Sequence, residues 1–303
     1  MTETVIVNDV GPRDGLQNQA TILTPAQRLQ LIQALVDAGV SHIEFGAFVS
    51  PKAVPAMAGA AEMAAALPPG TVHYTAPTPN PSGYALARDA GVRSMGLVVC
   101  ASNTMNEKNI RMGTEQAMTV CANVMQEAKA DGCDLQVYLS TAWECPFEGA
   151  VDPDVVVELS ARLLELGASQ VVISDTIGAA HPGEVRSLLS RLVDTVGASV
   201  LAAHFHDTRA LGMANAYAAL EAGIRRFDAS VGGLGGCPFA PGATGNIATE
   251  DLVMMLHLMG FETGIDIDKL LAAGQLAGEL TGQCTGGRAY PWLSRNTARL
   301  QPH

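Results

Sequence analysis

Short apolar runs alternate along the whole chain with longer segments in which apolar residues recur at helical spacing. The short runs are typical of buried strands, and the longer segments are typical of helices packed against them. Eight strands are expected, at Val5–Gly11, His42–Gly46, Val72–Pro77, Met95–Cys100, Leu135–Thr141, Gln170–Thr176, Leu201–Thr208 and Phe227–Gly233. Helices are expected at Pro25–Ala38, Lys52–Ala66, Ser82–Ala90, Glu115–Ala130, Asp154–Leu166, Pro182–Val196, Ala210–Ala222 and Glu250–Met259, with a last one near Asp266–Leu280.

The ends of these helices carry recognisable signals. Thr24-Pro25-Ala26-Gln27 predicts a capping box with proline at the first helical position, and Thr249 predicts a cap followed by acidic residues. Several helices end in a glycine that can adopt the left-handed conformation before the next strand begins. These glycines are Gly39, Gly91, Gly167 and Gly223.

The alternation predicts a (β/α)8 TIM barrel with a C-terminal helical extension. One catalytic domain then spans residues 1–303, with the barrel at about 4–262 and the extension at about 263–303. The alternative is a doubly wound open sheet, which has the same local pattern but usually carries a Gly-rich turn after its first strand. Here Gly11-Pro-Arg-Asp-Gly-Leu-Gln17 follows that strand instead.

Composition narrows the function. The 303 residues are 48% hydrophobic and 16% charged, with a net charge of −12, which argues against nucleic acid or an anionic membrane as partner. No N-terminal leader and no apolar stretch of membrane-spanning length is recognisable. The six cysteines are scattered, without a metal or disulfide spacing. We therefore expect a cytoplasmic protein with reduced thiols.

His204-Phe205-His206 is the most informative stretch, because residues two apart on a strand point to the same face. The two imidazoles then converge with Ala202 and Thr208, while Phe205 faces the opposite side. Burying two imidazoles is costly unless they bind a ligand, donate or titrate. A pair of structural histidines is the alternative.

Further polar residues stand where the predicted strands end, which is where the functional groups of such barrels gather. A Gly-rich segment, Gly232–Asn246, follows the last strand and contains Cys237. An acid, an arginine, two histidines, a cysteine and an asparagine at one rim can build a catalytic metal site. The strand-end residues are Arg13, Asp14, Glu44, Asp175, Thr176, His204 and His206.

Six segments together resemble the hydroxymethylglutaryl-CoA lyase family, within the wider group of barrel metallolyases and Claisen-type condensing enzymes. The resemblance runs from about residue 5 to about residue 275. The Cys-bearing loop combined with the His-x-His pair is specific to the lyases. The segments are Val10–Asn18, Phe48–Lys52, Ser174–Gly178, Ala203–Thr208, Gly233–Phe239 and Gly245–Asp251.

The resemblance implies that Asp14, His204, His206 and Asn246 bind a divalent cation. Oxygen ligands with imidazole suit Mg²⁺ or Mn²⁺, although Zn²⁺ or Co²⁺ can occupy the same set. Taken singly, Asp14 is also a plausible turn residue and Asn246 a plausible left-handed residue.

The implied reaction is a metal-dependent retro-Claisen cleavage of 3-hydroxy-3-methylglutaryl-CoA to acetyl-CoA and acetoacetate. Arg13 is the candidate to stabilise the enolate oxyanion, and a surface salt bridge is its alternative role. Cys237 matches the family's reactive cysteine and would act as proton donor, as base or within a relay. Cys145, in a second Cys-Pro-Phe tripeptide, is expected near the site.

The remaining residues are expected to support the site or bind substrate. Glu44, Asp175 and Gln17 resemble residues of the family that support the metal ligands without contacting the metal, or that relay protons. Glu44 can also pair with Arg13. Each has a structural role as its alternative. Arg13, Gln17 and Thr176 are also substrate-binding candidates. Lys108 and Arg111 are candidates for the phosphates of an acyl-CoA, unless their segment is simply a solvated loop.

Departures from the family pattern at Trp143, Glu144, Ser174 and Arg209 leave the acyl part open, and citramalyl-CoA is the alternative substrate. A Claisen-type synthase and a non-catalytic metal-binding barrel are the rival functions. The synthases usually carry an additional C-terminal domain for which this chain has no room. The family tends to form dimers, so a homodimer is expected.

Overall fold

Eight parallel strands close into a barrel, as predicted. The computed structural model describes residues 3–236, 245–283 and 286–296. Strand order around the barrel is β1-β10-β9-β8-β5-β4-β3-β2, so β1 and β10 close the ring and the open-sheet alternative is wrong. The strands are β1 (Ile6–Asp9), β2 (His42–Glu44), β3 (His73–Pro77), β4 (Ser94–Cys100), β5 (Asp134–Ser140), β8 (Gln170–Asp175), β9 (Leu201–Phe205) and β10 (Arg226–Ala229).

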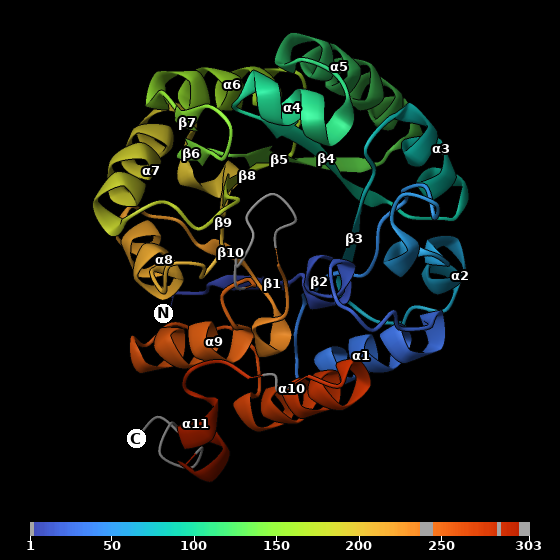
Figure 1. The fold of residues 1–303 in the computed structure, drawn as a ribbon, viewed down its shortest axis with the longest axis vertical. Helices are drawn as coiled ribbons and strands as arrows, with labels where there is room; N and C mark the ends of the chain where they lie inside the picture. The colour runs from blue at the N-terminus through green and yellow to red at the C-terminus, as the bar shows by residue number, and fades with distance from the viewer. Residues whose placement is uncertain (1–2, 237–244, 284–285, 297–303) are drawn as a thin grey trace.

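Helices surround this ring, and the main apolar core lies between them and the strands (Figure 1). Long helices α1 and α10 lie side by side, so a late helix of the chain packs against the first one. No helix in the described part of the chain is both long and apolar enough to cross a bilayer. The helices are α1 (Pro25–Asp37), α2 (Ala60–Ala65), α3 (Pro81–Asp89), α4 (Asn103–Ile110), α5 (Thr114–Asp131), α6 (Pro153–Glu165), α7 (Pro182–Val196), α8 (Gly212–Glu221), α9 (Thr249–Leu258), α10 (Ile267–Thr281) and α11 (Tyr290–Asn296).

Most of the predicted helix ends are confirmed. Thr24 and Gln27 form the capping box at the start of α1. The four glycines after helices have φ between 86° and 112°, the left-handed half of the map. The cap predicted at Thr249 is wrong. Ala248 is the residue before α9, and the Thr249 hydroxyl instead donates to the carboxylate of Asp9.

The helix predicted at Lys52–Ala66 is broken. A 3₁₀ turn at Pro55–Met57 precedes the shorter α2, because Gly59 at φ 79° interrupts the helical path. The fully buried Arg28 holds this segment through its guanidinium, which donates to the carbonyls of Ala58 and Phe45.

The segment at residues 103–111, for which a solvated loop was the alternative, contains α4. Ser102 caps its first turn, and Arg111 ends it in the left-handed conformation at φ 59°. Asn106 anchors the helix by bonding both the amide and the carbonyl of Cys100 at the end of β4. α4 therefore lies beside the mouth of the barrel.

β1 is shorter than predicted, because the chain leaves it for a wide π-helical turn at Gly11–Gly15. The fully buried Asp9 ties this turn to α9. Its carboxylate accepts from the amide of Gly11 at 2.8 Å and from the hydroxyl of Thr249 at 2.7 Å. A Cβ at Gly11 would lie 2.7 Å from that carboxylate, so glycine is required.

Asp9 makes a testable pH prediction, because burial raises its pKa from 3.8 to about 7. Between these values the unfolded chain has lost a proton that the folded protein keeps. The free energy of unfolding of the wild type should therefore fall with rising pH relative to Asp9→Asn, by up to about 1.4 kcal/mol per pH unit. The difference should level off above about pH 7. Urea unfolding of both proteins at several pH values measures it, and a difference that stays flat or rises contradicts the assignment.

Candidate metal centre and active site

Asp14, His204 and His206 converge at the carboxyl-end rim of the barrel. One ligand atom from each lies within 4.8 Å of the other two. His204 lies in β9 and His206 directly after it, and both side chains are more than nine-tenths buried. Their ring centroids are 5.1 Å apart, as a shared strand face requires. Ala202 also faces the barrel interior while Phe205 lies in the outer core, so the predicted alternation is confirmed.

Asn246, from the segment before α9, also lies in the cluster. A β-bridge pairs it with His206, and its amide nitrogen donates to the Asp14 carboxylate at 2.8 Å. A Cβ at Gly235 would lie 2.8 Å from that same nitrogen, so only glycine lets the chain pass there. All four predicted ligands therefore lie together.

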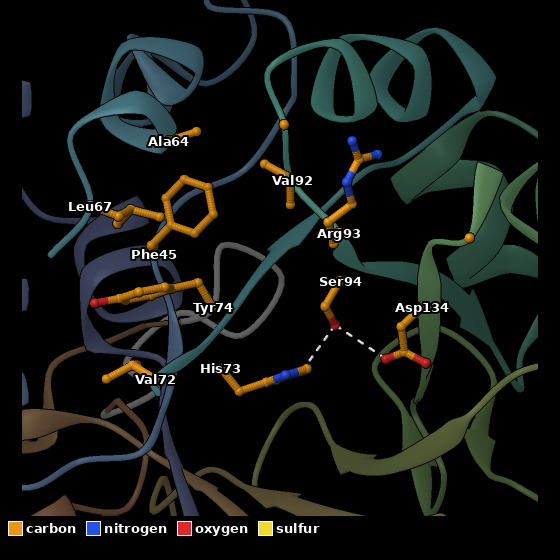
Figure 2. A pocket seen from close by; sticks show the side chains of 12 residues that line it. Phe45, Ala64, Leu67, Val72, His73, Tyr74, Val92, Arg93, Ser94 and Asp134 are labelled. Atoms are coloured by element: carbon orange, nitrogen blue, oxygen red, sulfur yellow. Dashed lines mark hydrogen bonds between the residues drawn. The ribbon is translucent and has the colours of Figure 1, made fainter. Parts of the chain in front are cut away.

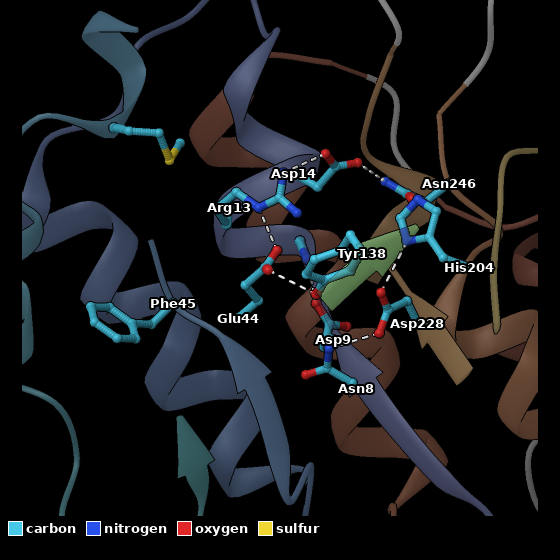
Figure 3. Close-up of polar contacts among 12 residues, drawn as sticks. Asn8, Asp9, Arg13, Asp14, Glu44, Phe45, Tyr138, His204, Asp228 and Asn246 are labelled. Carbon is cyan, nitrogen blue, oxygen red and sulfur yellow. Dashed lines mark hydrogen bonds and ion pairs between the residues drawn. The ribbon is translucent and has the colours of Figure 1, made fainter. Parts of the chain in front are cut away.

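Asp228 holds the His204 ring in one orientation. Its Nδ1 lies 3.0 Å from the Asp228 carboxylate, which also accepts from Asn8 at 2.8 Å (Figure 3). Burial lowers the pKa of His204, but Asp228 and Asp14 outweigh it and the net shift is upward. Because a carboxylate can only accept, Nδ1 carries the proton in the neutral ring, and Nε2 keeps its lone pair for a ligand.

Arg13 connects Asp14 with Glu44. Its Nη1 donates to Asp14 at 2.7 Å and its Nε donates to Glu44 (Figure 3). Burial alone would raise the pKa of Asp14, but Arg13 and the two histidines hold it well below its usual range. Asp14 is therefore ionised at neutral pH and available as an anionic ligand.

Glu44 is completely buried behind Arg13 and accepts a second hydrogen bond from the Tyr138 hydroxyl at 2.9 Å. Burial raises the pKa of Glu44 to about 7, against the opposing charge of Arg13. Burial likewise raises the pKa of Tyr138 well above its usual value, so its hydroxyl stays a donor. The predicted pairing of Glu44 with Arg13 is confirmed.

The cluster fits a divalent cation. It offers one ionised carboxylate, two imidazoles and an amide, the mixed oxygen and nitrogen set that such ions accept. Asn246 Oδ1 and His206 Nδ1 are buried without a hydrogen-bond partner among the described residues. Buried polar atoms are rarely left unpaired, so a bound species would satisfy a demand that the protein leaves open.

A cavity of about 790 Å³ opens directly over the cluster. Of the substrate-binding candidates, Arg13, Gln17, Thr176 and Arg111 line it, whereas Lys108 does not. The Lys108 ammonium lies 4.8 Å from the ring centre of Phe147, which places it on the outer side of α4. Lys52, to which no role was assigned, lines the cavity. The apolar residues that line the cavity include Val49, Val54, Met105, Ile110 and Met112.

Asp175 takes the structural role that was its alternative, Cys145 does not lie where it was expected, and Cys237 stays untested. Asp175 is buried, and its two oxygens accept from the amides of Ala179 and Ala180, which close the turn after β8. Cys145 is buried behind the cavity wall and accepts from the Ser102 hydroxyl at 2.9 Å, so it does not reach the cavity. Cys237 lies outside the described residues.

The hydrogen-bond partners Tyr138, Asp228 and Asn8 were missed. Each is a polar residue at an inward position of a strand, and that interruption of an apolar run is the only signal in the sequence. Their contacts join residues far apart in the chain, such as Tyr138 with Glu44.

A second cavity of about 460 Å³ lies at the opposite end of the strands, lined by Phe45, Tyr74, Val92 and Arg93 among others (Figure 2). Ser94 bonds His73 and Asp134 at its floor. No member of the ligand cluster lines it, so the chemistry belongs to the larger cavity.

Comparison with known proteins agrees with this site. The HMGL-like family model matches residues 4–277. Hydroxymethylglutaryl-CoA lyase of Pseudomonas mevalonii is 41% identical, over 98% of this chain and 99% of its own. (R)-citramalyl-CoA lyase of Chloroflexus aurantiacus is 40% identical, over 99% of this chain and 96% of its own.

Solved structures agree as well. Hydroxymethylglutaryl-CoA lyase from Pseudomonas aeruginosa superposes with a TM-score of 0.93 at 38% identity, covering 97% of this chain and 98% of that one. A hydroxymethylglutaryl-CoA lyase from Acinetobacter baumannii, in complex with coenzyme A and 3-methylmalate, gives 0.92 at 36% identity, with 99% and 98% covered.

Removal of a ligand should weaken cation binding. His206→Ala and Asn246→Ala should each lower Mn²⁺ affinity by at least about tenfold, because even residues that only support metal ligands typically cost 10–100-fold. Isothermal titration of metal-free protein measures the affinity. His257→Ala, at the end of α9 and bonded to Thr263, is the matched control. Affinities equal to that of the control would remove these residues from the ligand set.

Proposed function

The chain belongs to the HMGL-like family of carbon–carbon lyases, and we propose that it cleaves 3-hydroxy-3-methylglutaryl-CoA to acetyl-CoA and acetoacetate. The observation that carries this proposal is the Asp14, His204 and His206 cluster beside Arg13, on the wall of the 790 Å³ cavity. A metal-binding barrel without activity would have no need for a buried guanidinium facing the same cavity.

We propose that Asp14, His204, His206 and Asn246 hold Mg²⁺ or Mn²⁺, with Zn²⁺ or Co²⁺ as less suited occupants of the same set. When bound, such a cation lowers the pKa of a coordinated hydroxyl and polarises carbonyl oxygens. The anionic Asp14 and the fixed Nε2 of His204 are the residues that prepare the site for it.

Arg13 is proposed to act on the departing acetyl group. The tertiary hydroxyl of the substrate loses its proton, the C2–C3 bond breaks, and the electron pair passes to the acetyl-CoA enolate. Among the described residues, Glu44 and Asp14 engage Nε and Nη1, which leaves Nη2 of Arg13 for the enolate oxygen. A donor fixed in advance stabilises the charge that develops in the transition state.

The proton transfers are assigned to side chains around this centre. Cys237 is proposed as the proton donor to the enolate carbon, as base or within a relay. Gly236, directly before it, lines the cavity, and Asn246 beyond it lies in the cluster. Glu44 is proposed to orient Arg13. Asp175 is proposed to act through the turn that it closes, because both of its oxygens are already engaged there.

Lys52 and Arg111 are proposed to bind the phosphates of coenzyme A. Among the described residues, they are the lysine and arginine that line the large cavity outside the catalytic cluster. The apolar side chains that line the same cavity suit the pantetheine arm. We also propose a homodimer in the cytoplasm. The described cysteines are all free, as that compartment requires.

A panel of acyl-CoA thioesters tests the proposed substrate. Metal-loaded protein should release acetyl-CoA from 3-hydroxy-3-methylglutaryl-CoA faster than from citramalyl-CoA, the substrate named for one relative of nearly equal identity. Release should stop when a chelator removes the metal. A preference for citramalyl-CoA would reassign the substrate, and no cleavage of any thioester would refute the lyase.

Arg13→Gln should lower kcat by about 10²–10³-fold, the usual loss for one oxyanion donor. Arg191→Gln, at an exposed arginine of α7 that pairs with Asp154, is the control and should retain kcat. Both are compared at saturating metal. Loss confined to KM, with kcat intact, would show that Arg13 binds substrate without stabilising the transition state.

A further inference from the structure

The interior of the barrel is polar beneath the catalytic cluster. A cavity of about 310 Å³ opens at the amino ends of the strands, on the side away from the substrate cavity. Residues from seven of the barrel strands line it. Its polar lining includes Asn8, Thr75, Gln136, Gln170 and Asp228. The small apolar cluster inside the barrel consists of Tyr138, Val172 and Ala202.

One hydrogen-bonded column rises from this cavity to a metal ligand. Asn8 donates to one oxygen of Asp228 at 2.8 Å, and the other oxygen lies 3.0 Å from Nδ1 of His204 (Figure 3). Asp228 is 4% exposed and His204 7%, so water competes little for these bonds. Asn8 therefore sets the direction of the carboxylate that sets the direction of the imidazole.

A second column rises to the guanidinium. Gln136 donates to the Tyr138 hydroxyl at 3.1 Å, and that hydroxyl donates to Glu44 at 2.9 Å. Glu44 in turn accepts from Arg13. Because the hydroxyl has one proton, the bond from Gln136 fills its acceptor side and directs that proton toward Glu44.

We propose that Asn8 and Gln136 are positioning residues, each controlling one half of the active site from the opposite end of the barrel. Asn8 acts on the metal through His204, and Gln136 acts on the enolate through Arg13. The second assignment rests on the proposed function. Neither residue lines the substrate cavity, so neither touches substrate.

Other buried polar side chains in this cavity do not make comparable hydrogen bonds. Thr75 and Gln170 line the same cavity and are at least nine-tenths buried, yet Thr75 Oγ1 and Gln170 Nε2 have no hydrogen-bond partner among the described residues. Asn8 Oδ1 is likewise without a partner among the described residues, so the cavity tolerates unpaired polar atoms, and the Asn8 and Gln136 amide nitrogens are the ones that hold the two columns. Gln136 and Gln170 are both 8% exposed, which makes them a matched pair for substitution.

Asn8→Val tests the first column, with Thr75→Val as its control. The affinity of metal-free protein for Mn²⁺ should fall about tenfold in Asn8→Val, the lower end of the range for residues that support ligands. It should stay within about twofold of wild type in Thr75→Val. Should Asn8→Val fail to fold, Asn8→Ala carries the same expectation. Equal affinities in the variant and its control would overturn the role of Asn8.

Gln136→Met tests the second column, with Gln170→Met as its control and Gln136→Leu as the replacement if it does not fold. kcat at saturating metal should fall about 3- to 10-fold in Gln136→Met, the range for one hydrogen bond, while Mn²⁺ affinity stays unchanged. A merely structural role would move metal affinity, kcat and melting temperature together in both variants.

The two measurements also separate this inference from the proposed function. If the wild type cleaves no thioester, the proposed function and the role of Gln136 both fail. The Mn²⁺ affinities still decide the role of Asn8. If the wild type is active but Gln136→Met and Gln170→Met have the same kcat, the role of Gln136 alone is refuted.

Discussion

The site depends on the contacts that stabilise the buried carboxylate of Asp14. An ionised carboxylate loses hydration on burial and needs charged or hydrogen-bonding partners in return. Here Arg13 supplies one, Asn246 another, and the His206 imidazole lies 3.8 Å away. These partners come from the turn after β1, the segment before α9 and the end of β9. Three segments that are distant in the sequence therefore meet at the Asp14 carboxylate.

The closed barrel makes this meeting possible, because it brings all eight carboxyl ends of the strands to one rim. Asp9 and Thr249 hold the turn that carries Arg13 and Asp14. Gly178, at φ 64°, fits against the backbone carbonyl of His206, where a Cβ would approach to 2.8 Å. Below the rim, polar side chains replace the usual apolar layers and fix the directions of His204 and Arg13.

Much of this was predictable from local pattern. Period-two alternation placed His204 and His206 on one face, and the family motifs supplied Asp14 and Asn246. α4 was missed because its sequence has no apolar stripe, and its stability comes from a cap and from Asn106. Asn8, Tyr138 and Asp228 were missed because their partners lie on other strands. Which strands become neighbours is decided when the whole barrel closes, and no short segment of the sequence shows this.

The four converging side chains are proposed to bind a catalytic divalent cation. Crystals soaked in Mn²⁺ and measured at the manganese absorption edge test it most directly. One strong anomalous peak is expected, bounded by Asp14, His204, His206 and Asn246. A peak located elsewhere, or none between these residues at a saturating concentration of the ion, would contradict it.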